Sequence, residues 1–217
     1  AASFLMSAAG EKVESESLSA HAESVRRAIL KNMSRGGVLA DTAVSSHTAL
    51  HPNALALFSG LEPEEGWGCI VELVRRKRLK CGVFFSYFLL RGLYNIGESD
   101  LAYDLMTCDD ERSWMTMIKA GATTCMEAWG PEQKWNTSLC HPWAAAPVIM
   151  TASELFGLRP LEPGWGKIAF YPQIPRGLER ASMHMTVPQG RVSASFVQKG
   201  DEIEFTSDKK PGTIAVR

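Results

Sequence analysis

The turn-rich stretch "RPLEPGWG", residues 159–166, separates two kinds of sequence pattern. From residue 1 to about residue 156, apolar residues recur every three or four positions, which is typical of amphipathic helices. Beyond it, apolar and polar residues alternate, and "VPQGRV" (187–192) and "QKGDEIEF" (198–205) place glycine where a β-hairpin turns. The sequence therefore predicts a mainly helical part, residues 1–159, followed by a domain of antiparallel strands, residues 160–217.

Within the first part, helices are predicted over residues 15–33, 51–60, 63–79, 82–97, 99–106, 111–121 and 140–157. Ser15 or Ser17 is the expected N-cap of the first of these, and residues 1–10 indicate the end of an earlier helix that closes at Gly10. Strands are predicted near residues 167–171, 182–187, 191–198, 201–206 and 213–217. Because the sequence opens within a helix and stops within a strand pattern, we expect a longer parent protein and a strand domain that lacks one or two strands.

Composition narrows the class of partner. The 217 residues carry a formal net charge of −1, which does not favour nucleic acid or an anionic membrane as a partner. The basic run "RRKRLK" (75–80) is interpreted as a solvated helix end. Five cysteines without a CxxC pair indicate neither a zinc site nor a disulfide framework, and we expect most of them to be buried thiols. The longest apolar run, near residues 83–90, is too short to span a bilayer, and no motif predicts a cofactor or metal.

One carboxylate has unusual neighbours. Glu127 lies in "GATTCMEAWG" (121–130), among small, uncharged and aromatic residues, and no cation follows it within six positions. Its segment reads as a loop at a helix end, where catalytic groups are often held. Four of the six tryptophans, Trp114, Trp129, Trp135 and Trp143, occur within thirty residues around it. Tryptophan faces beside a carboxylate suit a sugar site, although a surface glutamate beside core tryptophans explains the same pattern.

Two further features allow alternative interpretations. His141 precedes Pro142 at a predicted helix start, so it is either a packed or capping histidine or a hydrogen-bond donor to a substrate hydroxyl. The acidic residues of "TCDDER" (107–112) are interpreted as helix caps rather than as partners in acid catalysis. The helix count fits either a bundle or part of an α-toroid.

Four successive blocks resemble the C-terminal part of bacterial α-L-rhamnosidases, glycoside hydrolase family 78. They are "CGVFFSYFLLRGLYNIGESDLAYDLM" (81–106), "SWMTMIKAGATTCMEAW" (113–129), "WNTSLCHPWAAAP" (135–147) and "GLRPLEPGWGKIAFYPQIP" (157–175). The resemblance implies that residues 1–159 form the later helices of an (α/α)6 toroid, followed by a C-terminal β-sandwich. It also implies hydrolysis of terminal α-L-rhamnosides with inversion, in which Glu127 is the general base and His141 and Trp129 line the rhamnose pocket.

Trp135 and Trp143 are added as substrate-binding candidates because they lie in the same tryptophan-rich stretch. In the family the general acid lies upstream, and no block before Glu127 resembles it, so the rest of the barrel is expected from a longer chain. The expected partner is a rhamnose-containing glycoside or polysaccharide. Two other functions fit the residues: a non-catalytic carbohydrate-binding or structural module, and another (α/α)6 glycosidase with a different substrate.

Overall fold

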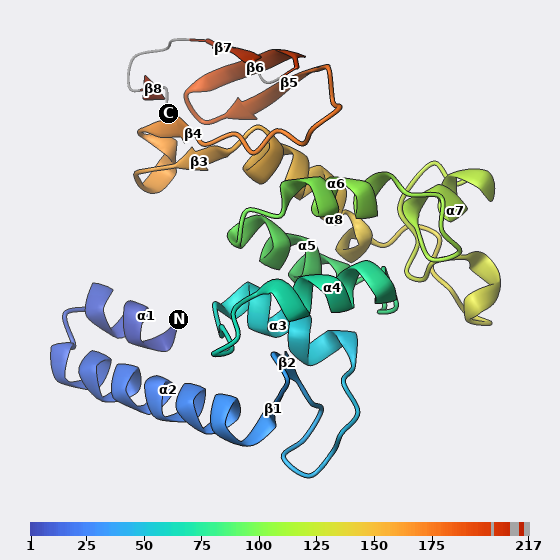
Figure 1. Ribbon diagram of the computed structural model, residues 1–217. Coiled ribbons are helices and arrows are strands. Elements are labelled where there is room, and N and C mark those ends of the chain that lie inside the picture. Colours follow the sequence, from blue (N-terminus) through green and yellow to red (C-terminus); the bar gives the residue numbers. More distant parts are fainter. Residues whose placement is uncertain (201, 209–212, 215–217) are drawn as a thin grey trace. The chain divides into compact units, whose positions relative to one another are not determined.

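The structure, a computed structural model, describes residues 1–200, 202–208 and 213–214 (Figure 1). Contacts between Cα atoms divide the chain into two compact units, residues 1–77 and 78–217. The chain is mainly helical up to residue 155, and an antiparallel sheet region follows, as predicted. This division into units does not fall at the predicted change of pattern, because the helices between residues 86 and 150 belong to the same unit as the later strands.

The first unit begins with two helices that pack against each other. They are followed by a short β-hairpin and two more helices; the bounds are α1 Ala2–Ala8, α2 Lys12–Met33, β1 Ser34–Arg35, β2 Val38–Leu39, α3 Leu50–Ser59 and α4 Gly68–Lys77. As predicted, α1 closes at Gly10, which has a left-handed φ of +87°, and the Glu11 N–H donates to the Met6 carbonyl.

Two predicted helix starts in this unit are wrong. Helix α2 begins three residues before Ser15, and the Ser15 hydroxyl donates to the Ser3 carbonyl of α1 instead of capping α2. Helix α4 begins five residues after Pro63, because Pro63 to Gly66 form a turn in which Gly66 adopts a φ of +80°. Packing of α1 on α2 and a glycine turn therefore override the local signals.

The second unit contains the remaining helices. Their bounds are α5 Ser86–Asn95, α6 Ser99–Thr107, α7 Trp114–Lys119, η1 Pro131–Gln133, η2 Pro142–Ala144, α8 Ala146–Met150, η3 Thr151–Leu155 and η4 Pro163–Trp165. The single helix predicted over residues 140–157 is wrong: it is split into a 3-10 turn, a short α-helix and a π-helical turn. Helix α5 is largely buried, which agrees with its nearly continuous apolar sequence.

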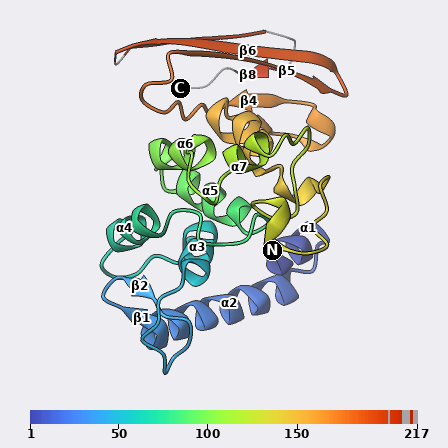
Figure 2. The same ribbon diagram turned by 90° about the vertical axis from the view of Figure 1, so that its right-hand side faces the viewer.

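The strands of this unit form two three-stranded sheets, in the orders β3-β4-β8 and β5-β6-β7. Their bounds are β3 Leu158–Pro160, β4 Ile168–Phe170, β5 Arg180–Val187, β6 Gly190–Lys199, β7 Glu202–Ser207 and β8 Thr213–Ile214. All pairs are antiparallel except β4 with β8. Both predicted hairpins are present, with Val187 opposite Gly190 and Lys199 opposite Glu202; Figure 2 shows β5 and β6 as the long strands.

Strand β3 was not predicted, because two of its three residues, Arg159 and Pro160, fall inside the turn-rich stretch. Of the strand predicted over residues 213–217, only 213–214 are described, and residues 215–217 lie outside the described part.

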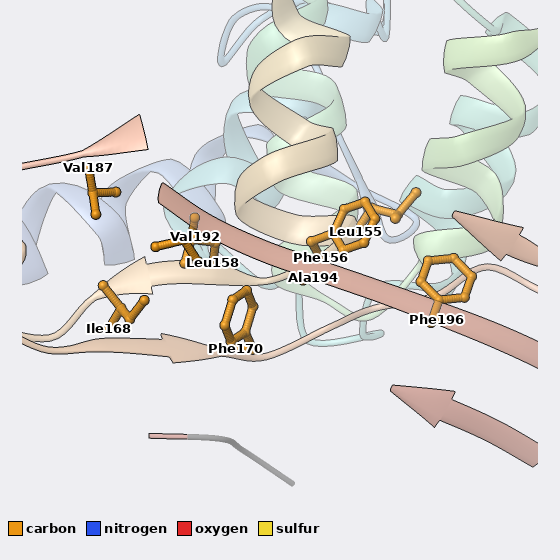
Figure 3. Packing of buried hydrophobic residues seen from close by; sticks show 9 residues of the cluster. All are labelled: Leu155, Phe156, Leu158, Ile168, Phe170, Val187, Val192, Ala194 and Phe196. Atoms are coloured by element: carbon orange, nitrogen blue, oxygen red, sulfur yellow. The ribbon is translucent and has the colours of Figure 1, made fainter. Parts of the chain in front are cut away.

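An apolar cluster fills the space between the end of the helices and the two sheets (Figure 3). It contains Leu155, Phe156, Leu158, Ile168, Phe170, Val187, Val192, Ala194 and Phe196, all at most 7% exposed. Phe156, at the end of the last helical turn, contacts Phe196 of β6 at a ring separation of 5.7 Å. These contacts attach the strands to the end of the helical part.

Gly157 is the point at which the helical part becomes strand. It has a φ of +66°, and its carbonyl accepts a hydrogen bond of 2.9 Å from the Tyr171 N–H. A Cβ atom at this position would lie 2.0 Å from the Tyr171 carbonyl carbon. Only glycine therefore fits both the backbone conformation and the close approach of the two chains.

Candidate functional site

The candidate site lies in the long loop between α7 and η2, residues 120–141. The loop begins where α7 ends: Gly121 adopts a φ of +80°, and the Ala122 N–H donates to the Met117 carbonyl, as in a glycine-terminated helix. The prediction of a loop around Glu127 is confirmed.

Two stretches of this loop pair with each other. The Glu127 N–H donates to the Ser138 carbonyl at 2.9 Å, and the His141 N–H donates to the Cys125 carbonyl at 2.8 Å. The Thr124 hydroxyl adds a bond of 2.6 Å to the Leu139 carbonyl. This pairing holds Glu127 and His141 on neighbouring strands of chain and closes residues 128–137 into a projecting lobe.

Buried residues on either side of Glu127 anchor its backbone. Met126 is 3% exposed, and its N–H approaches the Met117 sulfur at 3.4 Å. Trp129 is 2% exposed; its indole N–H donates to the Cys81 carbonyl at 2.7 Å, and its ring lies edge-on to Trp114 at 4.9 Å. The carboxylate between them is thereby attached to the core by both of its neighbours in the chain.

The Glu127 carboxylate is partly buried, with 16% of its side chain exposed, and both of its oxygens accept hydrogen bonds. Lys134 Nζ donates to Oε1 at 2.5 Å, and the Ser138 N–H donates to Oε2 at 3.1 Å. The Lys134 ammonium, the Ser138 N–H and the charge of His141 lower the pKa of Glu127, against the opposing effect of desolvation. Glu127 is therefore a carboxylate at neutral pH, suited to accept a proton.

An aromatic row lies beside His141. The imidazole of His141 contacts the ring of Trp143 at a tilt of 43°, with 4.1 Å between ring centroids, and Trp143 in turn contacts Phe84 at 5.4 Å. Trp143 and Phe84 are 44% and 48% exposed, which is high for rings of their size. We call His141, Trp143 and Phe84 the aromatic row. It places exposed apolar ring surface next to the polar atoms of His141.

The remaining predicted site residues lie differently. Trp135 is 96% exposed in the lobe, and Trp129 points into the core rather than toward solvent. Their roles in substrate binding stay predictions. Two residues of the arrangement were missed: Lys134 lies seven positions after Glu127, just beyond the window that appeared free of cations, and Phe84 is distant in sequence.

Other groups singled out by their residue types have structural partners. Arg78 of the basic run pairs with Asp104 and with Asp110, and Lys119 pairs with Asp109. The N-cap of α7 is Ser113, so the predicted acidic caps are wrong. Only Cys81 of the five free cysteines is buried, contrary to expectation. Cys69 in the first turn of α4 and Cys140 in the loop are exposed, and Cys108 and Cys125 are half-buried.

Among the described residues, no group of three or more His, Cys, Asp or Glu side chains is arranged to hold a metal ion. No helix in that part of the chain is long and apolar enough to cross a membrane. A groove of about 590 Å³ in the first unit is lined by Arg27, Leu30, Lys31, Ser34, Glu64 and Glu65, none of which belongs to the loop that carries Glu127.

Known proteins resemble the chain over almost its whole length. Residues 3–152 match the family model of the bacterial alpha-L-rhamnosidase 6 hairpin glycosidase domain, and residues 157–212 match that of the bacterial alpha-L-rhamnosidase C-terminal domain. An alpha-L-rhamnosidase of Formosa agariphila is 26% identical over 215 residues, which are 95% of this chain and 23% of that protein. One from Alteromonas sp. is 29% identical over 136 residues, 59% of this chain and 15% of that protein.

Solved structures agree on the fold. The alpha-L-rhamnosidase from Dictyoglumus thermophilum has a TM-score of 0.79 at 22% identity over 94% of this chain and 23% of its own. The Streptomyces avermitilis alpha-L-rhamnosidase complexed with L-rhamnose has a TM-score of 0.77 at 22% identity, over 99% of this chain and 21% of its own. The chain spans less than a quarter of the length of the curated relatives it matches.

Proposed function

Because the chain belongs to the bacterial α-L-rhamnosidase family of six-hairpin glycosidases, we propose that it supplies the general base of an enzyme that hydrolyses terminal α-L-rhamnosides with inversion. The observation that carries the proposal is the Glu127 carboxylate, held charged by Lys134 and Ser138 beside the aromatic row. A general acid needs a raised pKa, whereas the lowered pKa of Glu127 keeps the carboxyl group in the charged form that a base requires.

In the proposed reaction, Glu127 accepts a proton from a water as that water attacks the anomeric carbon of the rhamnose. A second carboxylic acid, about 6.5–9.5 Å away, protonates the leaving oxygen on the other face of the sugar. We propose that this acid comes from the rest of the toroid, upstream of the residues described here. Residues 1–159 are then the later helices of an (α/α)6 barrel, and residues 160–217 belong to a β-sandwich.

The aromatic row is proposed to hold the sugar for this step. The C–H faces of a pyranose pack on aromatic rings, and an imidazole N–H donates to a hydroxyl. Trp143 offers the ring face and His141 the donor, while the pairing of residues 124–127 with 138–141 sets their position relative to Glu127. A rhamnose-containing glycoside is the proposed ligand.

The stereochemistry of the product tests the proposal. With the protein as its cell produces it and an aryl α-L-rhamnoside, proton NMR should show β-L-rhamnose as the first anomer released, because a water activated by Glu127 attacks opposite the leaving group. Aryl glucosides should not be turned over. Release of the α anomer first would contradict the inverting assignment, and saturable rhamnose binding without turnover would indicate a binding module instead.

Trp143 allows a second test. Replacing Trp143 with Ala should raise KM for the rhamnoside about fivefold, since about 1 kcal/mol of aromatic contact is removed, with a smaller change in kcat. Phe4→Ala, which removes another exposed aromatic ring outside the loop, is the matched control and should leave KM unchanged. An unchanged KM in Trp143→Ala would show that the aromatic row does not bind the sugar.

A further inference from the structure

Lys134 has no place in the sequence pattern that identifies the site, yet it makes the shortest contact to Glu127. It follows the 3-10 turn Pro131–Gln133 in the projecting lobe, and its ammonium donates to Glu127 Oε1 at 2.5 Å. The lysine side chain is 43% exposed, whereas Glu127 is 16% exposed. The contact thus joins a half-exposed cation to a partly buried anion.

The backbone of the lobe places the Lys134 side chain next to the Glu127 carboxylate. The Lys134 carbonyl accepts hydrogen bonds from the Thr137 N–H at 3.1 Å and from the Thr137 hydroxyl at 2.7 Å, which closes a turn directly after the lysine. One residue later, the Ser138 N–H reaches the other oxygen of Glu127. A single turn therefore presents one charged and one neutral donor to the two oxygens of the same carboxylate.

Two donors do not use all of the hydrogen-bond acceptor sites of the carboxylate. Its two oxygens offer about four lone-pair directions, so an attacking water still has an acceptor on either oxygen. The donors also restrict rotation about the terminal torsion of Glu127, which is otherwise broad. An opposite charge at this distance favours the charged form of the carboxyl group over the neutral form.

We propose that Lys134 is a positioning residue of the hydrolytic reaction, which orients the Glu127 carboxylate and keeps it in the charged form that accepts the proton of water. The proposal rests on the general-base role given to Glu127 above. Lys134 itself touches neither substrate nor the reacting atoms in this scheme. It acts through Glu127 and extends the working range of the base toward acidic pH.

Three groups lower the pKa of Glu127, and substitutions can test the effect of Lys134 apart from the others. The three groups are Lys134 on the lobe, the Ser138 N–H on the paired strand of chain, and His141 at the start of η2. Lys134 is the first of these causes. Its removal raises the pKa of Glu127 toward the ordinary value, so the fraction of charged base at acidic pH falls.

The test is the pH dependence of kcat/KM in the protein as its cell produces it, with an aryl α-L-rhamnoside. Lys134→Met removes the charge with little change in length, and Lys134→Arg restores a cation. Lys167→Met is the matched control, because Lys167 forms an exposed ion pair with Glu162 at 2.5 Å in the strand region. The acidic limb of the profile reports the base of the free enzyme.

We expect Lys134→Met to move the acidic limb to higher pH, with a several-fold loss of kcat/KM on that limb and a smaller change at neutral pH. Lys134→Arg should keep the limb near its original position, and Lys167→Met should not move it. A limb that stays in place in Lys134→Met overturns the proposal, because a purely structural role of the lysine would lower the rate without moving it.

If Lys134→Met has no measurable turnover, the pKa of the Glu127 carboxyl group can be measured by carbon NMR titration instead. A raised pKa relative to the unsubstituted protein supports the proposal, and an unchanged pKa overturns it. Failure of the general-base role has a separate signature: Glu127→Gln would then retain turnover, whatever Lys134→Met does.

Discussion

Glu127→Gln should lower kcat for an aryl α-L-rhamnoside by about 100- to 10,000-fold, the range that a positioned general base contributes. The amide cannot accept the proton of the attacking water, although it nearly matches the carboxylate in shape. The amide oxygen can still accept the Ser138 N–H, so the paired loop should keep its conformation. Rhamnose binding, measured by calorimetry, should therefore remain.

Glu132→Gln is the matched control for this substitution. Glu132 lies on the exposed η1 turn of the same lobe, so the change removes a negative charge close in sequence without touching the paired carboxylate. Its kcat should equal that of the unsubstituted protein. Retained turnover in Glu127→Gln would show that another group is the base, even if the fold and family are unchanged.

The largest expected effect on stability is at Glu154. Its side chain is fully buried in the π-helical turn Thr151–Leu155, and its two oxygens accept hydrogen bonds from Arg91 of α5 and from Arg159 of β3, the latter at 2.8 Å. Glu154→Ala leaves both guanidinium groups without this carboxylate. Removing one partner of a fully buried pair costs about 3–5 kcal/mol, because the remaining charge is uncompensated. Arg91 and Arg159 are 27% and 40% exposed, so water compensates part of their charge and we expect a cost below that range.

The protein groups around Glu154 offer little compensation. Tyr94 Oη and Arg159 Nε are buried and have no hydrogen-bond partner among the described residues. The Glu154 carbonyl also accepts the Gln173 N–H at 3.1 Å, so a shift of the turn would disturb the chain that follows β4. The residue connects α5, the π-helical turn and β3, and its loss should loosen the attachment of the sheets to the helices.

Urea unfolding measures this effect. Glu154→Ala should lower the midpoint with little change in slope, since the surface exposed on unfolding is nearly the same. Glu162→Ala, which breaks the exposed pair with Lys167, should change the free energy of unfolding by less than about 1 kcal/mol. A loss of equal size in both variants would mean that burial of Glu154 does not set the cost.

The sequence was sufficient for features governed by neighbouring residues. Apolar periodicity located α2, α3, α5 and α6, and glycine at Gly10 and Gly60 marked helix ends. Alternation and turn glycines located β5, β6 and β7 together with both hairpins. Local conformational preference and side-chain periodicity act over a few neighbouring residues, so they can be recognised in the sequence alone.

Part of the candidate site was also accessible from the sequence. The block around Glu127 identified a carboxylate in a loop, and "HP" at residues 141–142 identified a short helical start, which the structure places as the turn Pro142–Ala144. The aromatic row was only half visible, because Phe84 and Trp143 are nearly sixty residues apart in the chain. Contacts over such separations depend on how α5 and the loop pack, not on local pattern.

What the sequence by itself determined is the helical first part, the strands after Gly157, the glycine that joins them, and the blocks that place the chain in its family. The tertiary structure alone decided that Trp129 faces the core, that Glu154 is buried between two arginines, and that Lys134 returns to Glu127. The physical reason is that burial and charge pairing depend on which distant groups share a volume, and so does the pKa of a carboxylate.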